Sequence, residues 1–175
     1  TAYFKPGYAY GGSCLPKDLK GLVTLAHDNY VNTPVLSCIG ASNEYQKKNA
    51  FELVAKSGRK KVCLVGLSFK EGTDDLRYSP SVDLAETLIG KGYRITIFDE
   101  NVRLSKLIGS NKAFVNERLP HLSELITDNL ENAIRENEVV IVNHRNFEVN
   151  TYHHILKEKH SVIDLVRIRE LESLP

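Results

Sequence analysis

The chain has 175 residues, and its 23 Lys+Arg against 22 Asp+Glu give a formal net charge of +1. This balance argues against a protein held to nucleic acid or to an acidic membrane by bulk electrostatics. With 42% apolar and 8% aromatic residues, the composition is that of an ordinary globular protein. The longest purely aliphatic run, 139–142, is far shorter than the ~18 residues that a membrane span needs. The chain contains no methionine and opens at Thr1, so we expect it to be a piece of a longer protein.

The cysteines and histidines bound the redox and metal chemistry. The chain's three cysteines cannot all pair with one another, and no CxxC or Cys/His cluster indicates a metal. His153 and His154 are neighbours, so on a helix they would point about 100° apart and make a poor chelating pair. We therefore expect no metal site and a reducing, cytoplasmic location.

The first predicted element is a helix that follows a Gly- and Tyr-rich stretch over 1–14. Apolar residues recur on one helical face from Pro16 onward: they are Leu19, Leu22, Val23, Ala26 and Tyr30. Pro16 suits the first turn, and Asp18 suits the positive end of the helix dipole.

A second, long helix is predicted from Pro34 to about Ser57. Thr33 is its expected N-cap, and Gly58 is expected to end it. At 1.5 Å per residue this helix would span roughly 36 Å. Its pattern is compatible with a spine between domains or a dimer contact, and equally with a plain amphipathic surface helix.

After Gly58 the pattern alternates between strands and helices. We predict strands at 61–67, 93–98, 139–143 and 161–165, and helices from Ser79 to about Gly90, at 102–108, 128–136 and 152–159, with an undecided segment at 113–115. This alternation predicts right-handed crossovers and a parallel sheet. The fold class is therefore α/β: a Rossmann-like domain over 60–175, preceded by a loop and helical segment over 1–59.

The densest chemistry lies in the glycine-rich loop before the first helix. Gly11 and Gly12 allow a sharp turn or a close approach to a ligand. Cys14 would lie at the N-terminus of the first helix, where the dipole and Lys17 favour a thiolate, and Asp18 could hold a water or a proton. Alternatively, Cys14 only fills a gap under the loop, and spacing alone does not decide between the two. The other two cysteines, Cys38 and Cys63, are interpreted as packing residues.

Two sequence blocks resemble a known family. Residues 8–18, Tyr-Ala-Tyr-Gly-Gly-Ser-Cys-Leu-Pro-Lys-Asp, closely resemble the active-site motif of the nucleotide-sugar 6-dehydrogenases, the UDP-glucose/GDP-mannose dehydrogenase family. Residues 66–80, Gly-Leu-Ser-Phe-Lys-Glu-Gly-Thr-Asp-Asp-Leu-Arg-Tyr-Ser-Pro, resemble the signature of its C-terminal domain. The Pro-Gly-Tyr-Ala-Tyr and Thr-Asp-Asp-Leu-Arg runs are more similar to the GDP-mannose branch than to the UDP-glucose branch.

The resemblance implies a reaction and its catalytic residues. Such enzymes oxidise a sugar C6 alcohol to a carboxylate with two NAD+, through a thiohemiacetal and a thioester on a cysteine. By motif position that nucleophile is Cys14. Asp18 would orient the hydrolytic water or take a proton, and Lys17 would lie near the nicotinamide.

The resemblance also implies binding residues. Arg77 would contact NAD and Lys70 the sugar nucleotide, whereas the residues alone favour solvated loop charges. Substrate contacts are implied at five further positions, some of them reaching a neighbouring subunit: Ala2, Tyr3, Lys5, Tyr8 and Gly11. The family usually has arginine where this chain has Lys5, and lysine keeps the charge but loses the bidentate fork.

Partners and competing interpretations follow from the same family likeness. The long helix matches the family's central helix, which implies a homodimer. NAD would be bound mainly by a separate N-terminal domain, so we expect the isolated chain to be inactive. The strand-end Asp99 imitates a ribose-binding acid, yet no GxGxxG follows the first strand. The alternative from another class is a sugar-nucleotide-binding or dimerisation module without chemistry.

Overall fold

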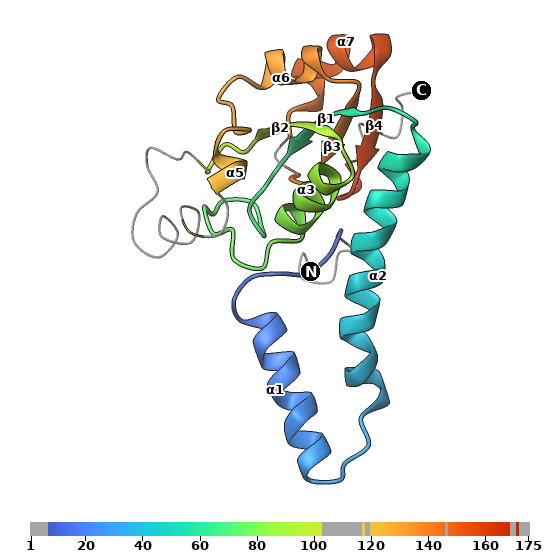
Figure 1. Ribbon diagram of the computed structural model, residues 1–175, viewed down its shortest axis with the longest axis vertical. Coiled ribbons are helices and arrows are strands. Elements are labelled where there is room, and N and C mark those ends of the chain that lie inside the picture. The colour runs from blue at the N-terminus through green and yellow to red at the C-terminus, as the bar shows by residue number, and fades with distance from the viewer. Residues whose placement is uncertain (1–6, 103–116, 118–119, 146, 169–170, 172–175) are drawn as a thin grey trace.

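The computed structural model describes residues 7–102, 117, 120–145, 147–168 and 171. Two helices, α1 (Leu15–Asp28) and α2 (Pro34–Lys56), form an antiparallel pair that projects from the rest of the molecule (Figure 1). Pro residues stand in the first turn of both helices, where a missing N–H costs nothing. The C-terminal part of α2 buries Ala50 and Val54 against the sheet domain, so α2 belongs to both parts of the molecule.

The sheet domain contains four parallel strands in the order β2-β1-β3-β4. They are β1 (Lys61–Val65), β2 (Arg94–Phe98), β3 (Val139–Val142) and β4 (Ser161–Asp164). The two inner strands, β1 and β3, are almost wholly buried, which explains why both read as continuous apolar runs. Strand order reverses at β1, and ligands of open α/β sheets bind at such a point, beside the carboxyl ends of the strands.

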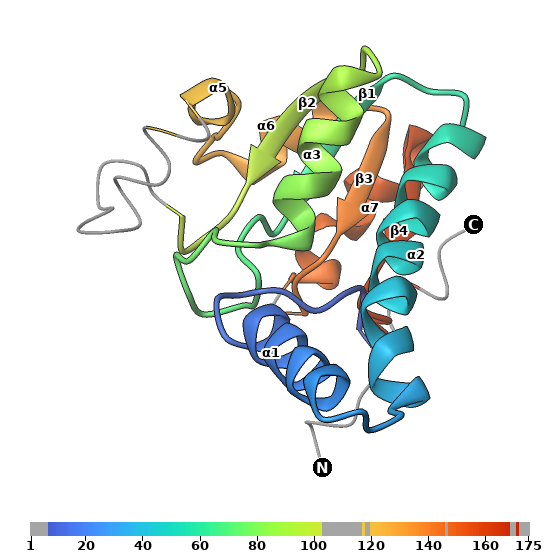
Figure 2. The same cartoon turned by 60° about the horizontal axis from the view of Figure 1, so that its bottom comes forward.

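Helices cover both faces of the sheet (Figure 2). α2 and α3 (Pro80–Gly90) pack on one face, and α6 (Leu130–Glu136) and α7 (Val149–Lys159) pack on the other. A short helix, α5 (Pro120–Ser123), flanks β2, where Ile126 forms a single bridge to Ile97. None of the helices in the described ranges combines the length and the apolar character that crossing a bilayer requires.

The α/β fold with a parallel sheet is confirmed, and most predicted elements are present. Ser79 caps α3 as expected, because its hydroxyl accepts the Ser81 N–H at 3.2 Å. Thr33 stands at the N-cap of α2 without a side-chain cap bond; instead, the Ser37 hydroxyl donates to the Thr33 carbonyl at 3.0 Å. Asn129 caps α6, and α7 begins three residues before the predicted start.

One prediction differs from the structure, one short helix and its neighbouring bridge were not predicted, and two predictions lie outside the described residues. Tyr30 was expected on the apolar face of α1, but the helix ends at Asp28. Tyr30 lies beyond that end with φ 56° and is 99% exposed. α5 and the Ile126 bridge were not predicted, because four residues and one bridge leave no periodic pattern. The helix predicted at 102–108, beyond the non-helical Val102, and the segment at 113–115 lie outside the described residues.

Candidate functional site

The cysteine loop, residues 7–14, is fixed to α2 by one side chain. The Tyr10 N–H donates to Asn43 Oδ1 at 2.9 Å, and Asn43 Nδ2 donates to the Tyr10 carbonyl at 3.0 Å. Asn43 thus satisfies both main-chain groups of Tyr10, as a neighbouring strand would. The loop therefore has a defined position over the long helix.

The same loop is pressed against the segment between β1 and α3. A Cβ on Gly11 would collide with the carbonyl oxygen of Tyr78. Gly12 has φ +84°, and a Cβ there would lie 2.9 Å from the ring of Phe69. Only glycine permits this approach. The two sequence blocks at 8–18 and 66–80 consequently meet in space.

Cys14 lies at the N-cap position of α1, as predicted, and is exposed. Its carbonyl accepts the Asp18 N–H at 2.8 Å, and the Ser13 hydroxyl lies 3.9 Å from its Sγ. Lys17 and Asp18 pair with each other at 3.2 Å, and both side chains are largely in solvent. The helix start therefore places a reachable thiol, a cation and a carboxylate within one turn.

A held arginine joins this group from the β1–α3 segment. Arg77 donates to Asp75 through Nε at 2.9 Å and through a terminal guanidinium nitrogen at 2.7 Å. The hydrogen bond with Asp75, its charge and, to a smaller degree, the charge of Cys14 raise the pKa of Arg77. The same hydrogen bond, working against burial, lowers the pKa of Asp75. The Asp75 carboxylate therefore holds the Arg77 guanidinium in a fixed pose on the segment that packs against the cysteine loop.

Lys70 lies exposed on the same segment. The start of this segment, directly after β1, is held by buried groups. Asp99 Oδ2 accepts the N–H groups of Leu67 at 2.8 Å and Ser68 at 2.9 Å, and also the Ser68 hydroxyl at 3.0 Å. His144 packs against Gly66, and its Nε2 lies 3.3 Å from the Ser68 carbonyl oxygen. Asp99 is only 4% exposed, and its carboxylate holds the start of this loop.

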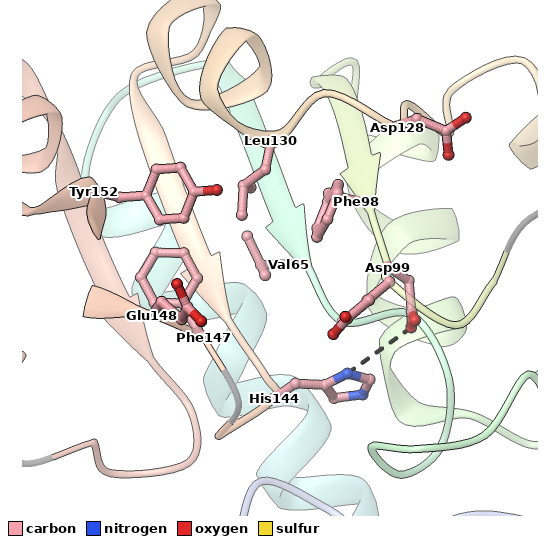
Figure 3. Close-up of a pocket in the computed structure, with 11 residues that line it drawn as sticks. Val65, Phe98, Asp99, Asp128, Leu130, His144, Phe147, Glu148 and Tyr152 are labelled. Carbon is pink, nitrogen blue, oxygen red and sulfur yellow. Dashed lines mark ion pairs between the residues drawn. The ribbon is translucent and has the colours of Figure 1, made fainter. Parts of the chain in front are cut away.

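A pocket opens beside this buried network, on the α6/α7 face of the sheet (Figure 3). Its volume is roughly 260 Å³. Asp99 and His144 form its floor beside a wall of stacked rings, Phe147 and Tyr152, whose centroids are 5.6 Å apart. Carboxylates dominate its polar lining, which therefore does not suit a phosphate.

Some of the predicted site residues lie together, one is buried in the core, and three lie outside the described residues. Cys14, Lys17 and Asp18 share one helical turn, and Gly11 touches the Tyr78 that follows Arg77. Tyr8 is buried in the core, where burial and then the carboxylates of Asp83 and Glu44 raise its pKa; its hydroxyl has no partner in the described part of the chain. Ala2, Tyr3 and Lys5 lie outside the described residues.

Three residues of this region escaped the sequence reasoning: Asn43, Asp75 and His144. Each acts across a long sequence separation or a tight turn, where periodicity carries no signal. The pairing of Asp75 with Arg77 could have been predicted from the sequence, because the two residues are only two positions apart and carry opposite charges.

The remaining cysteines differ from each other. Cys63 is buried in β1, and burial raises the pKa of its thiol to about 12, in keeping with a packing role. Cys38 was expected to be a packing residue. It is exposed on α2, so it does not fill a core position of the described chain. Among the described residues, no three His, Cys, Asp or Glu side chains gather closely enough to hold a metal ion.

Two family profiles match the chain. The profile described as "UDP-glucose/GDP-mannose dehydrogenase family, UDP binding domain" matches residues 63–170. The profile for the central domain of the same family matches residues 1–45.

Similar proteins and structures agree with these profiles. GDP-mannose 6-dehydrogenase from Pseudomonas putida is 44% identical over 164 residues, covering 94% of this chain and 37% of that protein. UDP-glucose 6-dehydrogenase from Rickettsia bellii is 32% identical over 131 residues, covering 72% and 29%. A ternary-complex crystal structure of GDP-mannose dehydrogenase from Pseudomonas aeruginosa superposes with a TM-score of 0.87 at 39% identity, covering 94% of this chain and 38% of that one. The chain thus covers between 29% and 38% of the length of these relatives.

Proposed function

Because the chain belongs to the UDP-glucose/GDP-mannose dehydrogenase family, we propose that it forms the cysteine loop, central helices and sugar-nucleotide domain of an NAD-dependent nucleotide-sugar 6-dehydrogenase. The observation that carries this proposal is the meeting of two distant motif blocks at Cys14, through Gly11 against Tyr78 and Gly12 against Phe69. We favour GDP-mannose as the substrate because the GDP-mannose 6-dehydrogenase of P. putida is 44% identical, against 32% for the UDP-glucose enzyme of R. bellii.

The proposed net reaction converts R–CH2OH, two NAD+ and water into R–COO−, two NADH and three protons. The Cys14 thiolate adds to the C6 aldehyde left by the first oxidation, forming a C–S bond, and the former carbonyl oxygen takes a proton. Loss of a second hydride from C6, together with the hydroxyl proton, turns this thiohemiacetal into a thioester. Asp18 orients the water that attacks the thioester; the C–S bond then breaks and the thiolate is restored.

NAD+, when bound, would supply the hydride acceptor for both oxidations. Arg77 and Lys17 are the described cations beside Cys14 that fit contacts to this anionic cofactor. The loop after β1 is held by Asp99 and lacks a glycine-rich phosphate turn, so this domain would contribute contacts rather than the main NAD cradle.

The proposed substrate site runs along the cysteine loop. Lys70 would contact the sugar nucleotide, and Gly11, packed against Tyr78, would hold the part of the cysteine loop that closes the site. Tyr8 would act by fixing the loop from the core. A groove of roughly 440 Å³ between this loop and α2 lies alongside. We keep Ala2, Tyr3 and Lys5 as proposed contacts, some of them serving a neighbouring subunit.

The proposed partner is a second copy of the chain. α1 buries no residue within the described part of the protein, and apolar side chains such as Leu25 and Val35 are exposed along the helix pair. This supports a division into a helical, dimer-forming part over 1–59 and a sugar-nucleotide domain over 60–175. Three free cysteines suit a reducing, cytoplasmic location.

The test uses the natural protein that carries this sequence. Cys14→Ser should reduce formation of the sugar acid at least about a thousand-fold, because serine at neutral pH provides no comparable nucleophile. Cys38→Ser, which removes the other exposed thiol, should leave the rate unchanged. Acid formation at the normal rate in Cys14→Ser would remove Cys14 from the mechanism.

A second measurement separates the substrate candidates and the non-catalytic alternative. GDP-mannose should raise the melting temperature more than UDP-glucose or GDP at equal concentration, because the ligand that binds the folded protein most tightly stabilises it most. The isolated 175 residues should produce no NADH. If the natural protein also produced none while binding the sugar nucleotide, the binding-module alternative would replace the enzyme.

A further inference from the structure

We propose that Asp75 is a positioning residue that holds the guanidinium of Arg77 beside Cys14. The inference rests on the proposed function for what Arg77 does in the reaction, but its geometry and its first test do not depend on substrate.

The Asp75–Arg77 pair has the geometry of a rigid clamp. Both carboxylate oxygens are engaged, Oδ1 with Arg77 Nε at 2.9 Å and Oδ2 with a terminal nitrogen at 2.7 Å. Oδ1 also accepts the main-chain N–H of Arg77 at 3.0 Å. The Asp75 side chain is 14% exposed and the Arg77 side chain 37%, so the carboxylate is fixed by its surroundings while the guanidinium faces outward. Bidentate pairs of this kind set the orientation of arginine as well as its charge.

The backbone around Asp75 is fixed in turn. The Asp75 N–H donates to the Thr73 hydroxyl at 3.2 Å, and its carbonyl accepts the Phe69 N–H at 3.2 Å. Phe69 is also the ring against which Gly12 packs. Phe69 therefore contacts both the Asp75 backbone and the cysteine loop.

Arg77 and Cys14 are linked from the other side as well. Tyr78, the next residue after Arg77, contacts Gly11 through its carbonyl oxygen. The charge of Cys14 is the smallest of the causes that raise the pKa of Arg77. A guanidinium released from Asp75 would be free to rotate into solvent, away from the thiolate.

Two possible roles for Asp75 predict opposite changes in the rate at which Cys14 is alkylated when Asp75 is removed. If Asp75 only compensates charge, its removal makes the surroundings of Cys14 more positive and speeds alkylation of the thiolate. If Asp75 positions Arg77, its removal loses the oriented cation and slows alkylation. The direction of the change thus distinguishes positioning from mere charge balance.

The first experiment measures iodoacetamide modification of Cys14 in the natural protein carrying Cys38→Ser, at fixed pH and low salt, with mass spectrometry to confirm the modified residue. Asp75→Asn should slow modification about threefold to tenfold, because one oriented partially exposed charge is lost. Asp74→Asn is the matched control: it removes a neighbouring negative charge but leaves the clamp, and should not slow the reaction. Arg77→Met should slow it as much as Asp75→Asn, and the double variant should show no further loss.

A second readout tests the role in catalysis. Asp75→Asn should lower kcat/KM for NAD with little change in KM for the sugar nucleotide, and should have little effect in an Arg77→Lys background, where the fork is already absent. Melting temperatures confirm that each variant is folded. Unchanged or faster alkylation in a folded Asp75→Asn variant overturns the positioning role. Slower alkylation in a protein without dehydrogenase activity would overturn the proposed function and leave the clamp intact.

Discussion

Gly66, which directly follows β1, is confined by its own backbone and by a neighbouring ring. Its φ is +97°, and a Cβ at this position would lie 2.6 Å from two carbons of the His144 imidazole. The imidazole in turn approaches the Ser68 carbonyl, so the glycine allows β1 to end against the group that holds the following loop. Glycine is therefore required at this position by both the positive φ and the close approach of the His144 ring.

Gly66→Ala should destabilise the protein by about 3 kcal/mol, from a positive φ and an overpacked contact together. Gly58→Ala is the control, because Gly58 also has a positive φ but has open space around its Cβ position; it should cost only about 1 kcal/mol. Urea unfolding of both variants measures the difference. Equal losses would show that the His144 contact yields without cost.

The β1–α3 segment as an element should respond to acid through Asp75. The pKa of Asp75 is lowered in the folded protein, first by its hydrogen bond with Arg77. Its stabilising contribution is therefore fully present above the ordinary pKa of an aspartate and is lost as the pH falls through the lowered value. Asp75→Asn should flatten the acid limb of the stability curve below about pH 4. Chemical unfolding across that range, with Asp74→Asn for comparison, measures this; parallel limbs in wild type and Asp75→Asn would contradict it.

The cysteine loop as an element depends on α2. Asn43→Ala removes both hydrogen bonds to the Tyr10 main chain and should raise the exchange rate of the Tyr10 amide about tenfold, as expected for a loss of about 1.4 kcal/mol. Gln46→Ala, at an exposed position about one turn further along α2, should leave that rate unchanged. Hydrogen exchange read by NMR or mass spectrometry tests this. An unaltered Tyr10 rate in Asn43→Ala would mean that other contacts hold the loop.

Sequence reasoning predicted the elements better than their meeting points. The inner strands and α3 were readable because apolar runs, Ser79 and Pro80 are local signals. Tyr30 misled because its spacing fits a helical face, while α1 has already ended two residues earlier. Asn43 against Tyr10 and Gly11 against Tyr78 could not be predicted from pattern, since they arise only when segments tens of residues apart are packed together.

The whole molecule has an unbalanced surface. Apolar side chains are exposed along the projecting helix pair: Leu22 48%, Leu25 60%, Val31 57% and Val35 76%. Water contact at exposed apolar side chains is costly, and apolar surfaces of this kind mark interaction sites. This arrangement supports the proposed homodimer.

Leu25→Glu together with Val35→Glu should convert the proposed dimer to a smaller species, because each charge would be buried in the contact without a partner. Leu53→Glu is the control: it is 47% exposed on α2 near the sheet domain rather than on the projecting part. Light scattering reports the mass. A monomeric wild type, or a double variant that stays dimeric, would exclude this surface as the contact.

The glycine pair of the cysteine loop also sets an order of assembly during synthesis. Gly11 and Gly12 leave the ribosome more than fifty residues ahead of Phe69 and Tyr78, against which they must pack. Proteins fold from the N-terminus as they emerge, so the nascent loop has no surface to shape it until β1 and the following turn are made. A half-synthesised chain therefore displays its thiol without the clamped arginine beside it.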